Sequence, residues 1–343
     1  MDEYLRRTNT IAPMMKTQLR RAAASCLMAL LAGCQNLVQP GGVAASGREP
    51  VVAATPVPEA PALAPAPPPL PAAPRPLRIA LALGGGAARG FAHVGVIKAL
   101  EARGIEPDIV VGTSAGSFVA ALYCAGYAGA DLQSVALQFE ESAITDWSLP
   151  SRGFFKGMAL QEFVNRKVDQ RPIEKLPRKL AVVATDLGSG EMKIFERGNV
   201  GMAVRASSSV PGVFQPVIIG GREYVDGGLV SPIPVRVARQ LGADVVIAVD
   251  ISRNPADQST TGAFDIVLQT FAIMGQTIAR TELQSADIVI RPSLGSVGST
   301  DFAAREAAIR EGEKAVAAQA VAISAVIDRA RQNLAGIGTP NTP

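Results

Sequence analysis

Short apolar runs recur along the chain from residue 77 onward, with little alternation between apolar and polar positions. They are rich in Val, Ile, Leu and Ala, and they lie at residues 77–83, 108–112, 179–185, 243–250 and 286–290. Strands that are apolar on both faces are typical of a parallel sheet that helices cover on both sides. The pattern therefore predicts a central, mostly parallel β-sheet.

Longer stretches of helical character separate these runs. They cover residues 91–103, 115–126, 158–169, 234–241, 262–284 and the alanine-rich 302–333. Because strands and helices alternate, we expect a three-layer α/β/α domain over residues 77–335, followed by a flexible tail at 336–343. In such sheets, functional sites gather in the loops beyond the carboxyl ends of the strands.

The first residues of the chain have the composition of an export signal. Basic residues precede the apolar run CLMALLAGC, which is too short to span a bilayer. Its last four residues, Leu31 to Cys34, resemble the lipobox of bacterial lipoproteins. This resemblance implies a signal peptide over residues 1–33, a lipidated Cys34 and a lipid-anchored protein of the cell envelope, on the periplasmic face of the outer membrane in a Gram-negative host. The alternative is a plain secretory signal in which the cysteine has no role.

Residues 34–76 form a different kind of segment. Of the chain's 25 prolines, 12 lie between residues 35 and 76, where they are interleaved with alanine. Proline has no backbone donor and alanine buries little area, so we predict a semi-extended tether. At about 3.1 Å per residue it could reach on the order of 130 Å, which would let the domain work far from its anchor.

The charge balance argues against a nucleic-acid-binding protein, and the cysteine content argues against a disulfide-bonded one. Five of the 33 Lys and Arg and two of the 30 Asp and Glu precede residue 35, which leaves 28 of each sign. A balanced chain gives no electrostatic case for nucleic acid. Cys26 falls in the leader and Cys34 would be lipidated, so we expect Cys124 to be a free thiol in the core, with no intrachain disulfide.

The first glycine-rich loop, GGGAARG at residues 84–90, follows the strand at 77–83 and opens a helix. A dinucleotide fingerprint would require glycine where Arg89 stands, and a phosphate-binding P-loop would require lysine where Phe91 stands. Neither nucleotide site fits. We therefore expect no cofactor and no metal.

The second loop suggests a task for the first. The sequence Gly112-Thr113-Ser114-Ala115-Gly116 matches Gly-x-Ser-x-Gly, the sharp strand-to-helix turn that exposes a nucleophilic serine. Such a serine needs hydrogen-bond donors for the oxyanion that forms on a carbonyl substrate. The backbone amides of Gly85, Gly86 and their neighbours could supply them. The alternative for Ser114 is a simple helix cap.

The general base has to be found elsewhere in the chain. The single histidine, His93, precedes Ser114, so the chain order of a Ser, Asp, His hydrolase cannot be met. Asp226 lies before Gly227 and Gly228 at the end of a strand, where its carboxylate could face a pocket. It could instead only open a turn. A carboxylate of ordinary pKa, about 3.9, is a poor base for a serine, so burial would have to raise that pKa.

At these residues the chain resembles the patatin-like phospholipases, which are serine acyl hydrolases with a Ser/Asp dyad. The resemblance covers roughly residues 77–290 and rests on three motifs in the family's order, with ATDLGSGE at 184–191 and RASSSVPGVFQPV at 205–217 in support. It implies Ser114 and Asp226 as the catalytic pair. The implied supporting residues are Gly84, Gly85, Gly86, Ala87, Arg89 and Gly90 at the oxyanion hole, Gly112 and Gly116 at the elbow, and Gly227 and Gly228 at the dyad turn.

The resulting expectation is hydrolysis of lipid acyl esters, of the phospholipase or lysophospholipase type. The alternatives are an acyltransferase that uses the same dyad, and a lipid-anchored binding module without turnover. The substrate would be a lipid or another acyl ester, the membrane contact would be the lipid on Cys34, and protein partners are unknown.

Several residues keep two interpretations. Arg89 could bind an anionic substrate or tie the glycine loop to the body, and His93 is more simply a packed histidine. Asp186, the rival carboxylate, is expected to brace a loop. Phe154, Phe155 and Met158 could form an apolar lip over an acyl pocket or belong to the core.

Overall fold

The computed structural model describes residues 75–140, 146, 152–257, 261–295 and 297–336 of the 343-residue chain. The predicted signal peptide, Cys34, the tether up to residue 74 and the tail from residue 337 lie outside the described residues. The predicted domain limits stay predictions.

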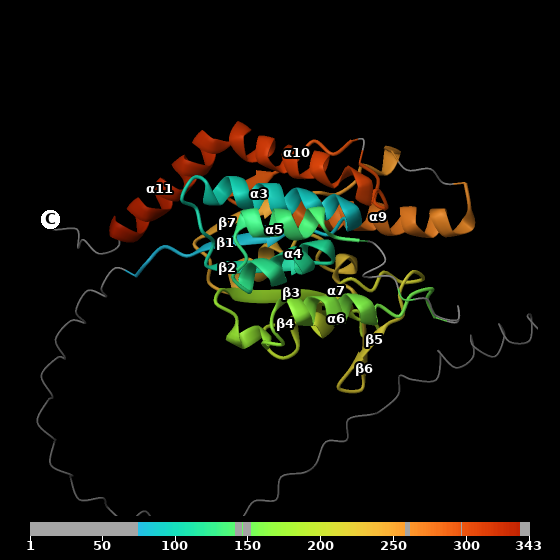
Figure 1. Ribbon diagram of the computed structural model, residues 1–343. Helices are drawn as coiled ribbons and strands as arrows, with labels where there is room; N and C mark the ends of the chain where they lie inside the picture. The colour runs from blue at the N-terminus through green and yellow to red at the C-terminus, as the bar shows by residue number, and fades with distance from the viewer. Residues whose placement is uncertain (1–74, 141–145, 147–151, 258–260, 296, 337–343) are drawn as a thin grey trace, which may run out of the picture. The chain divides into compact units, whose positions relative to one another are not determined.

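An eight-stranded sheet forms the centre of the described domain, with the order β5-β6-β3-β2-β1-β7-β8 and with β4 paired to β3 (Figure 1). The strands are β1 (Ile79–Leu83), β2 (Ile109–Thr113), β3 (Lys179–Asp186), β4 (Met192–Phe195), β5 (Val217–Ile219), β6 (Arg222–Asp226), β7 (Val245–Val249) and β8 (Ile288–Ile290). Strands β1, β2, β3, β7 and β8 pair in parallel, and they are the five predicted runs. Strands β4, β5 and β6 pair antiparallel; β4 and β5 were not predicted, whereas β6 is the strand expected to end at Asp226.

Helices cover both faces of the sheet. The α-helices are α3 (Phe91–Glu101), α4 (Ala115–Cys124), α5 (Gly129–Leu137), α6 (Met158–Lys167), α7 (Val200–Ser207), α8 (Val235–Gln240), α9 (Ala263–Leu283), α10 (Arg305–Ala318) and α11 (Ala320–Gly336). Short 3-10 turns are η1 (Ala87–Gly90), η3 (Ile173–Lys175), η4 (Gly227–Leu229), η5 (Pro255–Asp257) and η6 (Phe302–Ala304).

The side chains of β1 alternate between the two faces of the sheet, and those on one face are larger. On β1, Leu81 and Leu83 point to the face covered by α3, α4, α5, α6, α7, α10 and α11. Ala80 and Ala82 point to the other face, where α8 and α9 pack. The arrangement is the expected three-layer α/β/α domain with a mostly parallel sheet. Cys124 is buried in the core, as its apolar helix predicted.

The helix predictions need two corrections. The alanine-rich stretch 302–333 is not one helix, because η6, α10 and α11 follow one another. Helix α10 ends at Ala318, and the side-chain amide of the next residue, Gln319, donates to the Val289 carbonyl at 3.0 Å. Helices α5 and α7 lie outside the predicted helical stretches. No helix among the described residues has the length and apolarity needed to cross a membrane.

Candidate active site

Strand β3 brings two distant loops together. Val182 and Val183 pair with both β2 and β4, so β2 and β4 occupy opposite edges of β3. Ala184 and Thr185 pair with both β4 and β6, so β6 continues along the edge that β2 occupies. Thr113 at the end of β2 therefore lies opposite Val183, and the carboxyl ends of β2 and β6 meet head to head.

Ser114 follows β2 in a strained backbone conformation, with φ 53° and ψ −124°. Side chains other than glycine rarely adopt a positive φ, and such strain costs about 1–3 kcal/mol and is common at functional sites. The turn is tight: a Cβ on Gly116 would lie 2.2 Å from the Leu83 carbonyl oxygen, and one on Gly112 would lie 2.5 Å from the Ser117 nitrogen. Ser114 stands at the start of α4 but its side chain does not cap that helix.

Ser207, the last residue of α7, holds this turn in place. Its hydroxyl accepts a hydrogen bond from the Ser114 amide at 2.8 Å and donates one to the Val183 carbonyl at 2.5 Å. The side chain is fully buried, so these bonds are not shared with solvent. The serine-rich segment after α7 was singled out in the sequence, but no feature there distinguishes Ser207 from Ser208 or Ser209.

Asp226 ends β6 and lies beside Ser114. Its carboxylate accepts a hydrogen bond from the Gly228 amide at 2.7 Å, and the Ser114 side chain lies close enough to influence its ionisation. Burial raises the pKa of Asp226 to about 6, and the interactions with Ser114 and Gly228 limit the rise. The Asp226 amide donates to the Ser209 carbonyl at 2.9 Å, so the end of α7 supports both residues.

The glycine loop passes directly over the serine. A Cβ on Gly85 would lie 3.2 Å from the Ser114 Cβ. However, the Gly84 amide donates to the Val249 carbonyl and the Gly85 amide to the Pro232 carbonyl. The expectation that these two amides face an oxyanion is therefore corrected. Within the described residues, the amides of Gly86 and Ala87 have no partner, and Ala87 has a φ of 50°.

A family model described as patatin-like phospholipase matches residues 81–239, which include the glycine loop, the Ser114 turn and Asp226. Residues 81–239 belong to the patatin-like phospholipase family. The match lies within the span of the resemblance seen in the sequence.

The relatives share this part of the chain. Patatin-like phospholipase domain-containing protein 6 of Homo sapiens is 36% identical over 193 residues, which cover 54% of this chain and 14% of that protein. An uncharacterized NTE family protein of Mycobacterium tuberculosis is 36% identical over 186 residues, which cover 52% of this chain and 50% of the relative. The chain thus spans half or less of the length of these relatives. Among solved structures, VipD from Legionella pneumophila aligns with a TM-score of 0.46 at 15% identity, over 74% of this chain and 67% of VipD.

Arg89 connects the glycine loop to two later segments of the domain by hydrogen bonds. Its guanidinium donates to the carbonyls of Ile251, Leu294 and Val297 at 2.8–3.0 Å, and to that of Ser252 at 3.2 Å. Only 6% of the residue is exposed. Of its two interpretations, the structure supports the one in which Arg89 fixes the glycine loop to the body.

His93 is fully buried in α3, and its Nε2 lies 2.8 Å from the Gly84 carbonyl oxygen. Because a carbonyl only accepts, Nε2 carries the proton. Burial lowers the pKa of His93 to about 4, so the ring is neutral at pH 7. This fits the interpretation of His93 as a packed histidine, which holds the glycine loop through the Gly84 carbonyl.

Other predicted residues have supporting places in the domain. Asp186 accepts from the Gly188 and Ser189 amides and pairs with Arg222, which confirms that it braces a loop. A Cβ on Gly227 would lie 2.3 Å from the Val183 carbonyl oxygen, so only glycine fits where β6 ends. Likewise, Gly90 leaves room for Ala115 at the start of α4.

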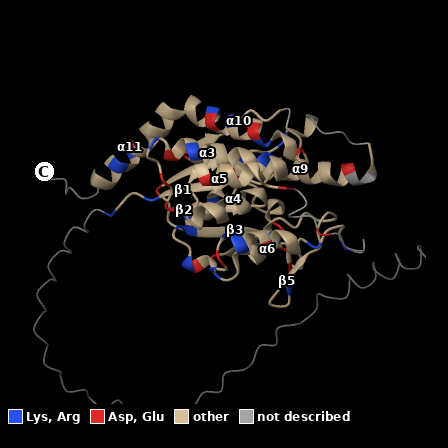
Figure 2. Ribbon diagram, viewed as in Figure 1, with Lys and Arg blue, Asp and Glu red and all other residues tan. Residues whose placement is uncertain are grey.

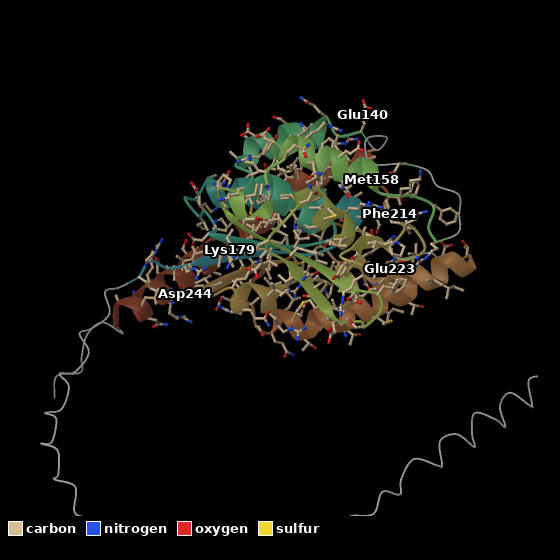
Figure 3. All side chains as sticks on the ribbon, turned by 90° about the horizontal axis from the view of Figure 1, so that it is seen from below. Glu140, Met158, Lys179, Phe214, Glu223 and Asp244 are labelled. Carbon is tan, nitrogen blue, oxygen red and sulfur yellow. The ribbon has the colours of Figure 1, made fainter. Side chains whose placement is uncertain are left out.

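An apolar pocket of about 190 Å³ begins at Ser114 and extends beneath the helices of the larger layer. Its lining includes Ala87, Ser114, Ala115, Phe118, Val119, Leu132, Phe139, Leu160, Phe214 and Phe302. Phe155 forms a β-bridge with Phe214, which lines the pocket, while Phe154 and Met158 are exposed. That these three residues form a lip over the pocket stays a prediction. Figure 3 shows Met158 and Phe214 close to each other at one end of the domain.

The described residues contain no group of three or more His, Cys, Asp and Glu that could hold a metal ion. The polar atoms around Ser114 come instead from one carboxylate, one hydroxyl and backbone amides. This set is suited to proton transfer and to binding a carbonyl oxygen.

Proposed function

We propose that the chain is a serine acyl-ester hydrolase that acts on lipids, of the phospholipase or lysophospholipase type. One observation carries the proposal: the Ser114 side chain interacts with the buried Asp226 carboxylate and lines an apolar pocket. The family match and the names of the relatives support a lipid substrate.

Asp226 and Ser114 share the proton transfers. Asp226 takes the hydroxyl proton of Ser114 while the Ser114 Oγ forms a bond to the ester carbonyl carbon. The leaving alkoxide departs with the proton held by Asp226, which leaves an acyl group on Ser114. Water then gives its proton to Asp226 and attacks the acyl carbon, and the proton returns to Ser114 as the fatty acid leaves.

The oxyanion of each tetrahedral intermediate would bind to backbone amides. Gly86 and Ala87 are the donors we assign, because the neighbouring amides of Gly84 and Gly85 are already bonded to carbonyls. Arg89 and His93 act through the loop, since both bond to carbonyl oxygens of the protein. Removing one donor from such a site in other hydrolases costs about 10²–10³ in kcat.

The pocket gives the acyl chain a place to bind. Phe118, Phe139 and Phe302 belong to a cluster of aromatic rings with centroids 5.7–6.3 Å apart. Such a lining favours an alkyl chain over a polar group. We infer that the acyl chain lies in this pocket and that the head group remains at the entrance.

The test is a fluorophosphonate probe followed by product analysis. We expect the folded wild type to be labelled at Ser114, and Ser114→Ala to remain unlabelled. Incubation with phospholipid and lysophospholipid should release free fatty acid from the wild type only. If folded wild type is neither labelled nor active on any ester, the proposal is wrong. If the acyl group instead appears on an added lipid acceptor, the enzyme is an acyltransferase.

We further propose that Cys34 carries a lipid and anchors the protein in the cell envelope. The lipobox-like sequence before Cys34 supports this assignment, together with the tether that follows it. The anchor and the active site would then act at the same membrane.

A further inference from the structure

Helix α9 has an unusual outer face. Ile266, Val267, Ile273 and Met274 are 47–55% exposed, and we call these four residues the α9 patch. Residues 266–279 include no Asp, Glu, Lys or Arg. Figure 2 accordingly shows the middle of α9 in tan. A helix on the surface of a soluble domain normally carries charged residues on its outer face, so this face is suited to an apolar partner.

The carboxyl-terminal part of α9 is firmly attached to the domain. Glu282 is buried, and its carboxylate accepts from the Ser231 hydroxyl at 2.6 Å and from the Ile233 amide at 3.2 Å. Arg236 lies 3.5 Å from the same carboxylate. These contacts fix the direction of the helix relative to the sheet.

The middle of α9 crosses the dyad turn. A Cβ on Gly275 would lie 3.8 Å from the Gly228 carbonyl oxygen, and Gly228 bonds to the Asp226 carboxylate. The residues before Gly275 continue past this turn, and Figure 1 shows that this half of α9 extends beyond the sheet. Glu223, Phe214 and Met158 lie toward the same end of the domain in Figure 3.

Other exposed apolar side chains lie near the entrance to the site. Phe154 and Met158 are 44% and 37% exposed. The Phe154 amide donates to the Val213 carbonyl, and Gly157 before Met158 faces the ring of Phe214, which lines the pocket. Helix α9 packs on one face of the sheet, and α6, which begins at Met158, packs on the other. Gly275 of α9 approaches Gly228 at the dyad turn, and Phe214 lines the same pocket as Ser114, so both groups lie near the site.

We propose that the α9 patch docks the domain onto the surface of a lipid bilayer, an inference that rests on the proposed function. The partner must cover apolar side chains at the end where the substrate enters. A second copy of the chain seated there would hinder access to Ser114, whereas a bilayer supplies the substrate. Burial of an apolar helix face in the interfacial region of a bilayer is a common mode of membrane binding.

The predicted anchor favours the same partner. A lipid on Cys34, followed by a tether of residues 35–76, would keep the domain within reach of a bilayer and raise its effective concentration there. A flexible tether does not orient the domain. The α9 patch would supply the orientation and turn the entrance toward the lipid.

The experiment uses the full-length chain with Cys34→Ser in every arm, so that a lipid anchor does not dominate binding. We expect Ile273→Glu with Met274→Glu to weaken co-flotation with phosphatidylcholine vesicles by about tenfold, because charge is placed where apolar area would be buried. Hydrolysis of vesicle phospholipid should fall in parallel. Hydrolysis of a soluble short-chain ester should stay within about twofold, as expected for surface changes.

Val321→Glu is the matched control. Val321 is 86% exposed and lies on α11, which packs on the other face of the sheet. This variant should bind vesicles as the parent does. If the double variant also binds like the parent, the docking surface is wrong. It is equally wrong if ultracentrifugation shows a parent dimer that the double variant converts to monomer, because the face then joins two copies.

The same measurements separate this inference from the proposed function. A parent chain that binds vesicles through the α9 patch but hydrolyses no soluble ester would uphold the docking surface and overturn the hydrolase. A parent chain that hydrolyses the soluble ester but loses nothing on substitution of the patch would do the reverse.

Discussion

Two titratable side chains of the site have pKa values far from their ordinary ranges, and burial is the main cause for both. It raises the pKa of Asp226 to about 6 and lowers that of His93 to about 4. At pH 7 Asp226 is therefore mostly ionised and His93 is neutral. The carboxylate has the raised pKa that suits a general base, and the imidazole is occupied with a loop carbonyl.

Asp226→Asn should inactivate the enzyme about as severely as Ser114→Ala. The amide keeps the shape of the side chain but cannot take a proton, and residues that act as a unit fail together. General acid-base catalysis contributes about 10²–10⁴ in rate, so ester turnover of both variants should drop by at least this range. His93→Gln, folded by circular dichroism, should keep most of its rate. The assignment of the dyad is wrong if His93→Gln is inactive and Asp226→Asn is active.

The pH profile of kcat/KM should follow the ionisation of Asp226. The carboxylate works as a base only when it is deprotonated, so the rate should rise with pH through about 6 and be level above it. A soluble ester at constant ionic strength would report this without a change in the lipid phase. A midpoint near 4, the value of an exposed carboxyl, would contradict the buried position of Asp226.

At the scale of elements, the site forms where the antiparallel strand β6 meets the parallel strand β2. Strands β2 and β6 share an edge of β3, and their carboxyl ends meet beside Val183. Two serines at and just after the end of α7 bond to the residues that follow or end these strands. The Ser207 hydroxyl accepts from the Ser114 amide, and the Ser209 carbonyl accepts from the Asp226 amide. The geometry of the candidate site is thus set by three elements and not by the turn alone.

Ser207→Ala should lower kcat by about tenfold to a hundredfold with little change in KM. The Ser114 amide would lose its acceptor and the buried Val183 carbonyl its donor, and an unsatisfied buried group costs about 1–3 kcal/mol. Because Ser207 does not line the pocket, substrate binding should be spared. Steady-state kinetics on a soluble ester measures both constants.

Ser209→Ala is the control for this change. Its hydroxyl donates to the Arg205 carbonyl, and the backbone carbonyl that serves Asp226 would remain. We expect nearly unchanged kcat. Equal losses in the two variants, or a Ser207→Ala enzyme with normal kcat, would show that Ser207 does not position the nucleophile.

At the scale of the whole molecule, the predicted anchor and the domain should be separable. Cys34→Ser should abolish metabolic lipid labelling and stable membrane fractionation, since one weak apolar contact does not replace a covalent lipid. The purified variant should keep its activity on a soluble ester, because residues 75–336 hold the whole candidate site. Stable membrane retention of the unlipidated variant would instead show that the domain has a strong anchor of its own.

Much of the fold could be predicted from local patterns. The five parallel strands are short apolar runs, and the turn at Ser114 has its glycines where neighbouring backbone comes within 2.5 Å. Strands β4 and β5 escaped prediction because they are short and partly exposed. The break between α10 and α11 escaped too, because Gln319, the residue after α10, makes a long-range contact with Val289.

The sequence by itself determined the parallel sheet, the candidate nucleophile and the candidate base, because strand pattern, glycine spacing and the lack of a second histidine are all local or compositional facts. Tertiary structure alone decided which loop amides remain open, why His93 and Arg89 face the protein interior, and that Ser207 supports Ser114. These are contacts between residues far apart in the chain. No spacing rule specifies them, since they arise only when the strands have paired on β3 and the helices have packed.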